Sequence, residues 1–459
     1  MYRSMCAGAL AFACLAMAPC VLQARVYSVG PPGSGRDYTS LADVFAHNTL
    51  GPGDVVEVDG DAVYPGGIVL EADDGGREGK PLVVRWRRDR GGTRPVLEGG
   101  DHTIKFERAN HVVLEGFEIR GGQRSCIFSE AHDVTVRDSV IHHCPAHGIL
   151  GADQNSGSFT LEYSEVAHSG QGTRKHAIYM QSDEVAWPGS VFRMRYNHVH
   201  SATGGVLVRV RHERAEIHYN WIEGGRYGEV ELIGPDCETQ QEGWSAGMAR
   251  EDAELVGNVI VHRSRWPNAI RIGGDLNGRS QGRVRLVNNT LVFLNRGAAN
   301  AVMVQLGAGS LEMHNNVVHQ VERGRLAIVR ENPPCSVETP FCGPQGREPW
   351  TTGRLVAGSH NWVPADASLV PPEWTATLAG TDPGFVDVGR LGLRPAADSP
   401  LRAAGTATPH PPARSAFPRP VAVATYEPPA RVAPASGWTR ARIHPGGRPD
   451  IGALEAVPR

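Results

Sequence analysis

Five residues between positions 176 and 271 have side chains suited to moving protons and binding anions: His176, Tyr179, Arg209, Arg211 and Arg271. Histidine and tyrosine act as a general base or general acid when they are held at a reacting group. Guanidinium groups stabilise negative charge that develops on a carboxylate during a reaction. Together these residue types suit removal of a proton beside a carboxylate, while a second group protonates the oxygen that leaves.

Two glutamates in the same stretch could hold a cation. Glu229 and Glu231 are two residues apart, so a β-strand would place both carboxylates on one face, about 7 Å apart along the chain. Oxygen ligands of this kind suit Ca²⁺, and the sequence therefore predicts a Ca²⁺ site at this pair. The alternative is an ordinary ion pair, because Arg209 or Arg271 on a neighbouring strand could neutralise the same carboxylates.

Further residues nearby are candidates for holding a substrate. Long insertions at 182–190, 234–251 and 273–282 border the same stretch, and loops around one groove are where a scaffold places specificity. The tryptophans in two of these insertions could stack on the face of a sugar or could anchor the loops themselves. The predicted substrate-binding residues are Lys175, Gln181, Trp187, Trp244 and Gln305.

The elements that position these residues follow from an internal repeat. Eight segments share an eight-residue pattern with apolar residues at positions three and eight, and the last five have asparagine at position six. They begin at Val112, Val134, Phe159, Phe192, Ala215, Ala253, Val284 and Leu311. A fixed strand pattern with insertions of variable length is typical of the stacked coils of a solenoid. We interpret each segment as one strand with period-two alternation, and the asparagines as a hydrogen-bonded ladder.

A second strand is predicted in each coil, 14 to 19 residues after the start of the repeat. Its outward row is predicted to contain Tyr179, Leu207, Glu231, Arg271 and Met303. Two residues further along, the predicted outward residues are Gln181, Arg209 and Gln305. Because neighbouring strands stack about 4.8 Å apart, this pattern indicates a flat parallel sheet with a polar, partly charged ladder on its outer face.

The ends of the chain differ from the repeats. Residues 1–24 have the short positive start and apolar stretch of a secretory signal peptide, which predicts a secreted or periplasmic protein. We assign 25–100 to an N-terminal cap with a short helix and the first coils, 101–332 to the core, and 333–459 to the last coil and an irregular, Pro-rich segment that packs on the coils. No later stretch is long enough to span a membrane, so we expect a soluble monomer.

Composition and cysteine content narrow the function classes. The 459 residues carry a formal net charge of −3, which argues against a nucleic-acid groove. Five cysteines follow the signal peptide, and export permits disulfides. Cys335 with Cys342 and Cys126 with Cys144 are the candidate pairs, which leaves Cys237 over. No CxxC motif occurs, so metal binding by cysteine is not expected.

The chain resembles secreted right-handed parallel β-helix proteins of the pectate-lyase-like superfamily. The resemblance rests on GPGDVVEV, HAIYMQ, GNVIVHRS, VNNTLV and MHNNVV, on the asparagine ladder, and on the closing SPLRAAG and DIGALE, and it covers roughly residues 27 to 455. It implies an all-β, single-stranded parallel β-helix with an N-terminal capping helix and an irregular C-terminal tail. Members mostly act on acidic polysaccharides, and in many of them the outward sheet forms the substrate groove.

What the resemblance implies for activity is a polysaccharide lyase that cleaves a uronic-acid polymer by β-elimination. The site is loosely similar to that of chondroitinase B and related alginate lyases, with Glu229 and Glu231 matching their calcium ligands and Arg271 their groove arginine. Where relatives often have Lys-Ser-Arg this chain has Arg209-Val210-Arg211, so only Arg211 matches and the base is not identified. The alternatives are a glycoside hydrolase, a C5-epimerase, or a surface protein that binds glycan without catalysis.

Overall fold

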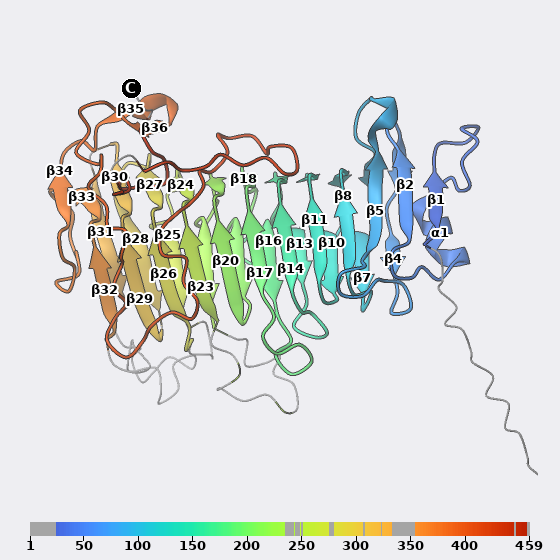
Figure 1. Cartoon of the computed structure of the whole chain (residues 1–459), viewed down its shortest axis with the longest axis horizontal. Coiled ribbons are helices and arrows are strands. Elements are labelled where there is room, and N and C mark those ends of the chain that lie inside the picture. Colours follow the sequence, from blue (N-terminus) through green and yellow to red (C-terminus); the bar gives the residue numbers. More distant parts are fainter. Residues whose placement is uncertain are drawn as a thin grey trace, which may run out of the picture.

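The computed structural model describes residues 24–234, 243, 248, 251–274, 280–305, 308–322, 324–332, 354–444 and 447–456. Over these residues the chain winds into an elongated stack of coils (Figure 1). Three long sheets, called A, B and C here, run the length of the stack, and every strand pair within them is parallel. This arrangement fits a right-handed parallel β-helix and confirms the predicted fold class.

The strands of each sheet stack in chain order, one from each coil. Sheet A contains β1 (Val26–Val29), β2 (Val55–Asp59), β5 (Leu82–Arg87), β8 (Val112–Glu115), β11 (Val134–Arg137), β14 (Phe159–Glu162), β17 (Phe192–Arg195), β20 (Arg214–His218), β23 (Asp252–Val256), β26 (Arg283–Val287), β29 (Ser310–His314) and β32 (Val356–Ser359). Sheet B contains β3 (Val63–Pro65), β6 (Val96–Glu98), β9 (Glu118–Arg120), β12 (Val140–His142), β15 (Glu165–Ala167), β18 (His198–His200), β21 (Trp221–Glu223), β24 (Val259–His262), β27 (Thr290–Phe293), β30 (Val317–Gln320), β33 (Trp362–Pro364) and β34 (Leu378–Gly380).

The third face of the helix carries the predicted second strands. Sheet C contains β4 (Ile68–Leu70), β7 (His102–Glu107), β10 (Ser125–Glu130), β13 (His147–Gly151), β16 (Ile178–Gln181), β19 (Val208–Arg211), β22 (Val230–Ile233), β25 (Asn268–Gly273), β28 (Ala298–Gln305) and β31 (Arg325–Glu331). Outside the three sheets lie α1 (Leu41–His47), the 3₁₀ turns η1 (Arg88–Arg90) and η2 (Val388–Arg390), and an antiparallel pair of β35 (Phe385–Asp387) and β36 (Gly392–Pro395).

The repeated eight-residue segment is two strands and not one, which corrects the sequence interpretation. Its fifth residue has a positive φ between 48° and 89° in all eight repeats. These residues are Gly116, Asp138, Tyr163, Tyr196, Tyr219, Gly257, Asn288 and Asn315. Glycine, aspartate and asparagine enter this left-handed region readily, whereas tyrosine does so at a cost. The left-handed residue turns the chain from sheet A into sheet B.

The asparagine ladder lies at this corner, as predicted. Each asparagine except the last donates from Nδ2 to Oδ1 of the asparagine on the next coil, at 2.9 to 3.0 Å. The ladder runs through Asn197, Asn220, Asn258, Asn289, Asn316 and Asn361, so it extends one coil beyond the repeats found in the sequence. All six are fully buried, and the same side chains also bond to backbone groups, which satisfies the polar atoms of the corner.

The interior of the coils is apolar and continuous. The third residues of the eight repeats, from Leu114 to Met313, are all fully buried in one core cluster. At the N-terminal end α1 covers this core with Leu41 and Val44 (Figure 1). The Ser40 hydroxyl accepts from the backbone N–H of Asp43 and so caps the helix. The capping helix expected from the sequence is therefore present.

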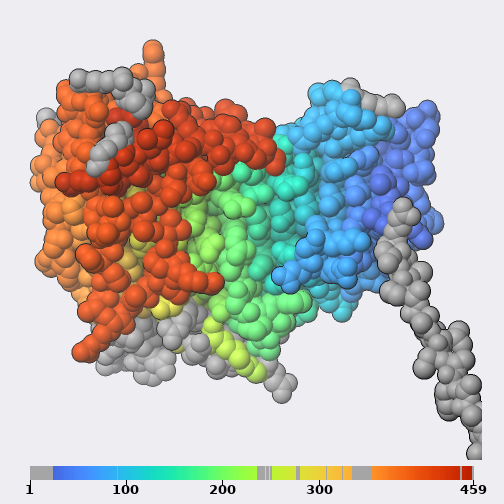
Figure 2. Space-filling view, viewed as in Figure 1, coloured from blue at the N-terminus to red at the C-terminus, as the bar shows by residue number. Residues whose placement is uncertain are grey.

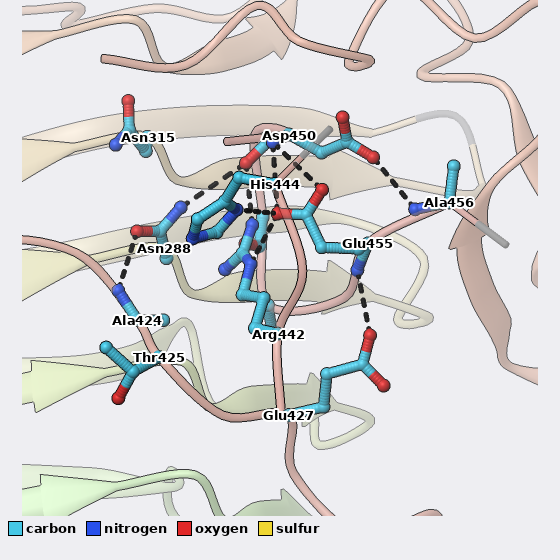
Figure 3. A network of polar contacts seen from close by, with 12 residues as sticks. Asn288, Asn315, Ala424, Thr425, Glu427, Arg442, His444, Asp450, Glu455 and Ala456 are labelled. Carbon is cyan, nitrogen blue, oxygen red and sulfur yellow. Dashed lines mark hydrogen bonds and ion pairs between the residues drawn. The ribbon is translucent and has the colours of Figure 1, made fainter. Parts of the chain in front are cut away.

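The C-terminal segment returns along the coils (Figures 1 and 2). Glu455 accepts from Arg442 Nε at 2.6 Å and contacts His444 Nδ1 at 3.0 Å (Figure 3). Asn288, at the corner of one coil, donates to the Asp450 carbonyl and accepts from the Ala424 backbone N–H. The closing DIGALE motif thus ties the tail to itself and to the corners of the coils.

One disulfide joins Cys126 and Cys144, whose Cα atoms are 5.7 Å apart, which confirms this candidate pair. The other predicted pair, Cys335 with Cys342, lies outside the described residues, as do Cys237 and residues 1–23 of the predicted signal peptide. The helices of the described part of the chain are all too short to cross a membrane.

Candidate functional site

The predicted ladder of polar side chains lies on the outer face of sheet C, with one change of register. The observed row places Tyr179 beside Arg209, then Glu231, Arg271 and Met303. Leu207, which the repeat pattern predicts in this row, is fully buried. Arg209 takes the position predicted for Leu207, so the prediction is wrong by two residues on β19. Because side chains alternate with period two, a shift of two residues leaves Arg209 and Arg211 on the outer face.

Glu231 lies between two arginines from the neighbouring coils. Its carboxylate accepts from Nη2 of Arg271 at 3.0 Å, lies 2.9 Å from Nε of the same guanidinium as an ion pair, and pairs with Arg209 Nη1 on the other side. Arg271 also donates from Nη1 to Oε1 of Gln305 at 3.0 Å. The side chain of Glu231 is only 12% exposed, so this is a largely desolvated carboxylate held by two guanidiniums.

Arg211 and Tyr179 form the second contact of the row. Arg211 donates from Nε to the phenolic oxygen of Tyr179 at 3.0 Å and from Nη1 to the carbonyl of Gly234. The guanidinium of Arg209 lies over the Tyr179 ring, 5.4 Å from its centre. Because Arg211 occupies a lone pair of the phenolic oxygen, the O–H proton of Tyr179 is left to point toward another acceptor.

His176 lies under this row and is held as a neutral imidazole. It is 3% exposed, and its Nδ1 accepts from the backbone N–H of Val206 at 3.1 Å. Burial, with a contribution from the charge of Arg209, lowers the pKa of His176 to about 2. The adjacent His147 accepts from the His176 backbone in the same way, and burial lowers its pKa to about 4. His176 therefore carries its proton on Nε2, which suits a hydrogen-bond donor and not a base.

The two glutamates of the predicted Ca²⁺ pair engage different partners. Glu229 is fully buried, accepts from the Gly225 backbone N–H and contacts Nδ1 of His262 at 2.6 Å. Burial raises the pKa of Glu229; it lowers that of His262, but the Glu229 carboxylate outweighs this and leaves the His262 pKa raised. Glu229 precedes β22 and points toward sheet B, whereas Glu231 lies within the strand and faces the arginines. The alternative, an ion pair at Glu231, is the arrangement observed.

The predicted substrate-binding residues lie in different settings. Gln181 is the register neighbour of Arg211, and Gln305 accepts from Arg271, so both belong to the row. Lys175 is exposed at the entrance to β16. Trp187 stacks on His132 with ring centres 4.1 Å apart and donates to the Asn155 carbonyl at 3.0 Å, which makes it an anchor of its loop. Trp244 lies outside the described residues.

Two buried glutamates at the end of the row were missed from the sequence. Glu184 follows β16, is 7% exposed and accepts from the Ser182 hydroxyl at 2.8 Å, and burial raises its pKa to about 7. Glu251 accepts from Ser280 at 3.2 Å, and its other carboxylate oxygen has no hydrogen-bond partner among the described residues. Burial and the charge of Glu184 raise the pKa of Glu251, and Arg211 acts in the opposite direction. Both lie in the insertions at 182–190 and 234–251, where the repeat gives no register.

Comparisons with known proteins agree with the fold. No family model matches the chain, and no curated protein matches it by sequence. Among solved structures, the pectate lyase Pel9A superposes with a TM-score of 0.52 at 14% identity, over 94% of this chain and 96% of that one. A rhamnogalacturonan lyase gives 0.41 at 15% identity, over 67% and 86% of the two chains. A PL6 family polysaccharide lyase from Pseudopedobacter saltans gives 0.37 at 9% identity, over 79% and 94%. The chain thus has a fold found in a polysaccharide lyase.

Proposed function

We propose that this protein is a secreted polysaccharide lyase that cleaves a uronic-acid polymer by β-elimination on the outer face of sheet C. The observation that carries the proposal is the row on sheet C in which Arg209 and Arg211 of β19 contact Tyr179, while Arg271, two strands further along the sheet, holds Glu231 from the other side. A guanidinium presents two parallel N–H donors that match a carboxylate. Strands of neighbouring coils lie about 4.8 Å apart, so they would present such donors at regular intervals along an extended anionic chain.

The arginines supply the electrostatic part of the reaction. In β-elimination the C5 proton of the uronate is removed, its bonding electrons form the C4–C5 double bond, and the C4–O bond breaks. Negative charge develops on the carboxylate group as the proton leaves, and preorganised cations in a partly desolvated site stabilise that charge. Arg209 and Arg271 already hold one carboxylate, that of Glu231, in this manner.

Tyr179 is the group we assign to proton transfer. Its oxygen accepts from Arg211, which fixes the direction in which its own O–H can donate. The other candidate, His176, has its Nδ1 engaged by the backbone and its pKa lowered far below neutrality by burial. Tyr179 therefore suits protonation of the leaving oxygen. We assign acceptance of the C5 proton to Glu184, because burial raises its pKa to about 7 and a carboxyl group of that pKa is partly ionised at neutral pH.

The alternative of a glycoside hydrolase has less support in the row. Hydrolysis requires a pair of carboxyl groups flanking the bond, roughly 5–9.5 Å apart. Of the two glutamates expected to supply the pair, Glu229 is fully buried against His262 and only Glu231 faces outward. A C5-epimerase would use the same charge stabilisation and proton removal but would return a proton to C5 instead of breaking the C4–O bond.

Product analysis on a panel of uronic-acid polymers separates these functions. The lyase generates unsaturated products that absorb in the ultraviolet, a hydrolase generates reducing ends without that absorbance, and an epimerase changes neither chain length nor absorbance. Arg271→Ala should abolish the signal. Arg137→Ala is the matched control, because Arg137 pairs with Glu115 across coils of sheet A in the same way but lies on another face. Folded protein without product on any polymer would contradict the proposal and favour a non-catalytic glycan-binding role.

A further inference from the structure

A second cluster of chemically active side chains lies on sheet B, away from the arginine row of sheet C. His198 and His200 are the first and third residues of β18, so their side chains leave the same face of the strand. Glu165, on the adjacent strand β15, is the direct register neighbour of His198. One ligand atom from each of these three residues lies within 4.8 Å of the other two. Among the residues that the structure describes, this is the group of three that could hold a metal ion.

We propose that Glu165, His198 and His200 bind a Zn²⁺ ion. Two imidazole nitrogens and a carboxylate oxygen are donors that Zn²⁺ prefers, and three protein ligands leave a fourth position for water. A tetrahedral Zn²⁺ with bonds of about 2 Å keeps its ligand atoms roughly 3–3.5 Å apart. Nε2 of His200 and Oε1 of Glu165 are already 3.2 Å apart. The sequence signal for the site is His-x-His on a strand beside a glutamate one coil earlier.

The hydrogen bonds of His200 prepare it for this role. Its Nδ1 contacts the hydroxyl of Ser201 at 2.9 Å while its Nε2 faces the carboxylate of Glu165. When Nδ1 donates its proton to Ser201, the lone pair of Nε2 faces the lone pairs of the carboxylate, and a cation between the two removes that repulsion. An outer partner that fixes the tautomer in this way is the usual companion of a metal-binding histidine.

The surroundings of His198 also favour a bound Zn²⁺ ion. His198 is 6% exposed, and its buried Nε2 has no hydrogen-bond partner within the part of the chain that the structure describes. The carboxylate nearest to this nitrogen, that of Glu223 at 3.5 Å, is already held by Arg431 at 2.7 Å and Arg263 at 3.5 Å. A buried ring nitrogen with no partner is costly unless something binds it. A cavity of about 430 Å³, lined by both histidines, gives an ion and its water a way in.

Zinc bound here would link neighbouring coils, because its ligands come from β15 and β18. This role is independent of the chemistry proposed for sheet C, and it is tested without any substrate. The full chain is dialysed against a chelator, freed of it, and titrated with Zn²⁺ in a calorimeter. Binding of one ion per chain is expected, and Co²⁺ in place of Zn²⁺ should give the visible absorption of a tetrahedral site.

The variants His200→Gln and Glu165→Gln should each weaken Zn²⁺ binding by at least about tenfold. His218→Gln is the matched control, because Nε2 of His218 lies 3.5 Å from the carboxylate of Glu254 on sheet A, the same separation as His198 and Glu223. Thermal unfolding followed by circular dichroism checks that each variant is folded. Because two variants are tested, the experiment remains decisive if one of them does not fold. No binding of Zn²⁺, or binding that both variants leave unchanged, overturns the proposal.

Discussion

Arg211 donates its Nε–H to the phenolic oxygen of Tyr179 at 3.0 Å, and the two residues come from adjacent coils that are 32 residues apart in the sequence. A second donor of the same guanidinium binds the carbonyl of Gly234. The arginine is therefore fixed by contacts on two sides, and its position fixes that of the tyrosine oxygen. This relationship joins the architecture of sheet C to the proposed chemistry.

Arg211→Lys should lower kcat on the polymer substrate by about a hundredfold, because small displacements of a reacting group cost about that much. An ammonium group keeps the charge but cannot reach the Tyr179 oxygen and the Gly234 carbonyl with fixed, planar geometry. Initial rates of unsaturated product formation measure the loss, with Arg137→Lys as a control on sheet A. An Arg211→Lys enzyme as active as the wild type would show that the guanidinium geometry is not used.

Tyr179→Phe keeps the ring beneath Arg209 and removes only the hydroxyl group. General acid–base groups typically contribute about 10² to 10⁴ in rate, so kcat should fall by that order while polymer binding is retained. Binding is measured by affinity electrophoresis in a gel that contains the polymer, and turnover by ultraviolet absorbance. Equal loss of binding and turnover would assign Tyr179 to substrate contact instead of proton transfer.

Glu231→Ala should lower the free energy of unfolding by roughly 1–3 kcal/mol, because it leaves two partly buried guanidiniums without their shared carboxylate. Urea denaturation monitored by tryptophan fluorescence provides the measurement. Glu57→Ala removes the more exposed pair with Arg85, whose side chain is 47% exposed, and should cost about 0.5 kcal/mol or less. Equal costs for the two variants would mean that the pairing on sheet C adds nothing beyond an ordinary surface contact.

The stability of the protein should fall as the pH rises from about 4.5 to about 7, through the titration of Glu184. Burial raises the pKa of this carboxyl group to about 7, so between these values the folded state binds a proton that the unfolded state has lost. The shift corresponds to a contribution on the order of 3 kcal/mol that is present at low pH and absent above neutrality. Urea midpoints across this range should show a smaller slope for Glu184→Gln than for the exposed control Glu78→Gln.

The regular parts of the fold were predictable because the same residue types occupy the same structural positions in successive coils. Buried apolar residues at position three and asparagines at position six recur in every coil or in a long run of coils, and each serves the same role each time. The corner between sheets A and B was missed because Tyr163, Tyr196 and Tyr219 adopt a left-handed conformation that tyrosine disfavours. Their rings stack at 5.2 and 5.5 Å, and this contact between coils offsets a local preference that a single repeat does not reveal.

The sequence predicts which side chains of the site point outward from sheet C, but it does not predict which residues they contact. Alternation along β19 placed Arg209 and Arg211 outward even with the register displaced by two residues. Alternation failed at Glu229, because that residue precedes the strand and turns toward His262, 33 residues further along the chain. Glu184 and Glu251 follow no repeat at all, so no alternation rule predicts that both are buried. The positions of such residues relative to each other could not be predicted from the sequence.

The disulfide between Cys126 and Cys144 should contribute about 3 kcal/mol to stability, since closing a loop of this length removes conformational entropy from the unfolded chain and so raises its free energy. The double variant Cys126→Ala with Cys144→Ala should unfold at a lower urea concentration than the wild type, and a reducing agent should lower the wild-type midpoint toward that of the variant. Both cysteines are buried in the core beside the first half of sheet C, so alanine also removes some packing. The double serine variant and the reduced wild type separate the two effects. A reduced wild type with an unchanged midpoint would show that the core of the coils alone sets the stability.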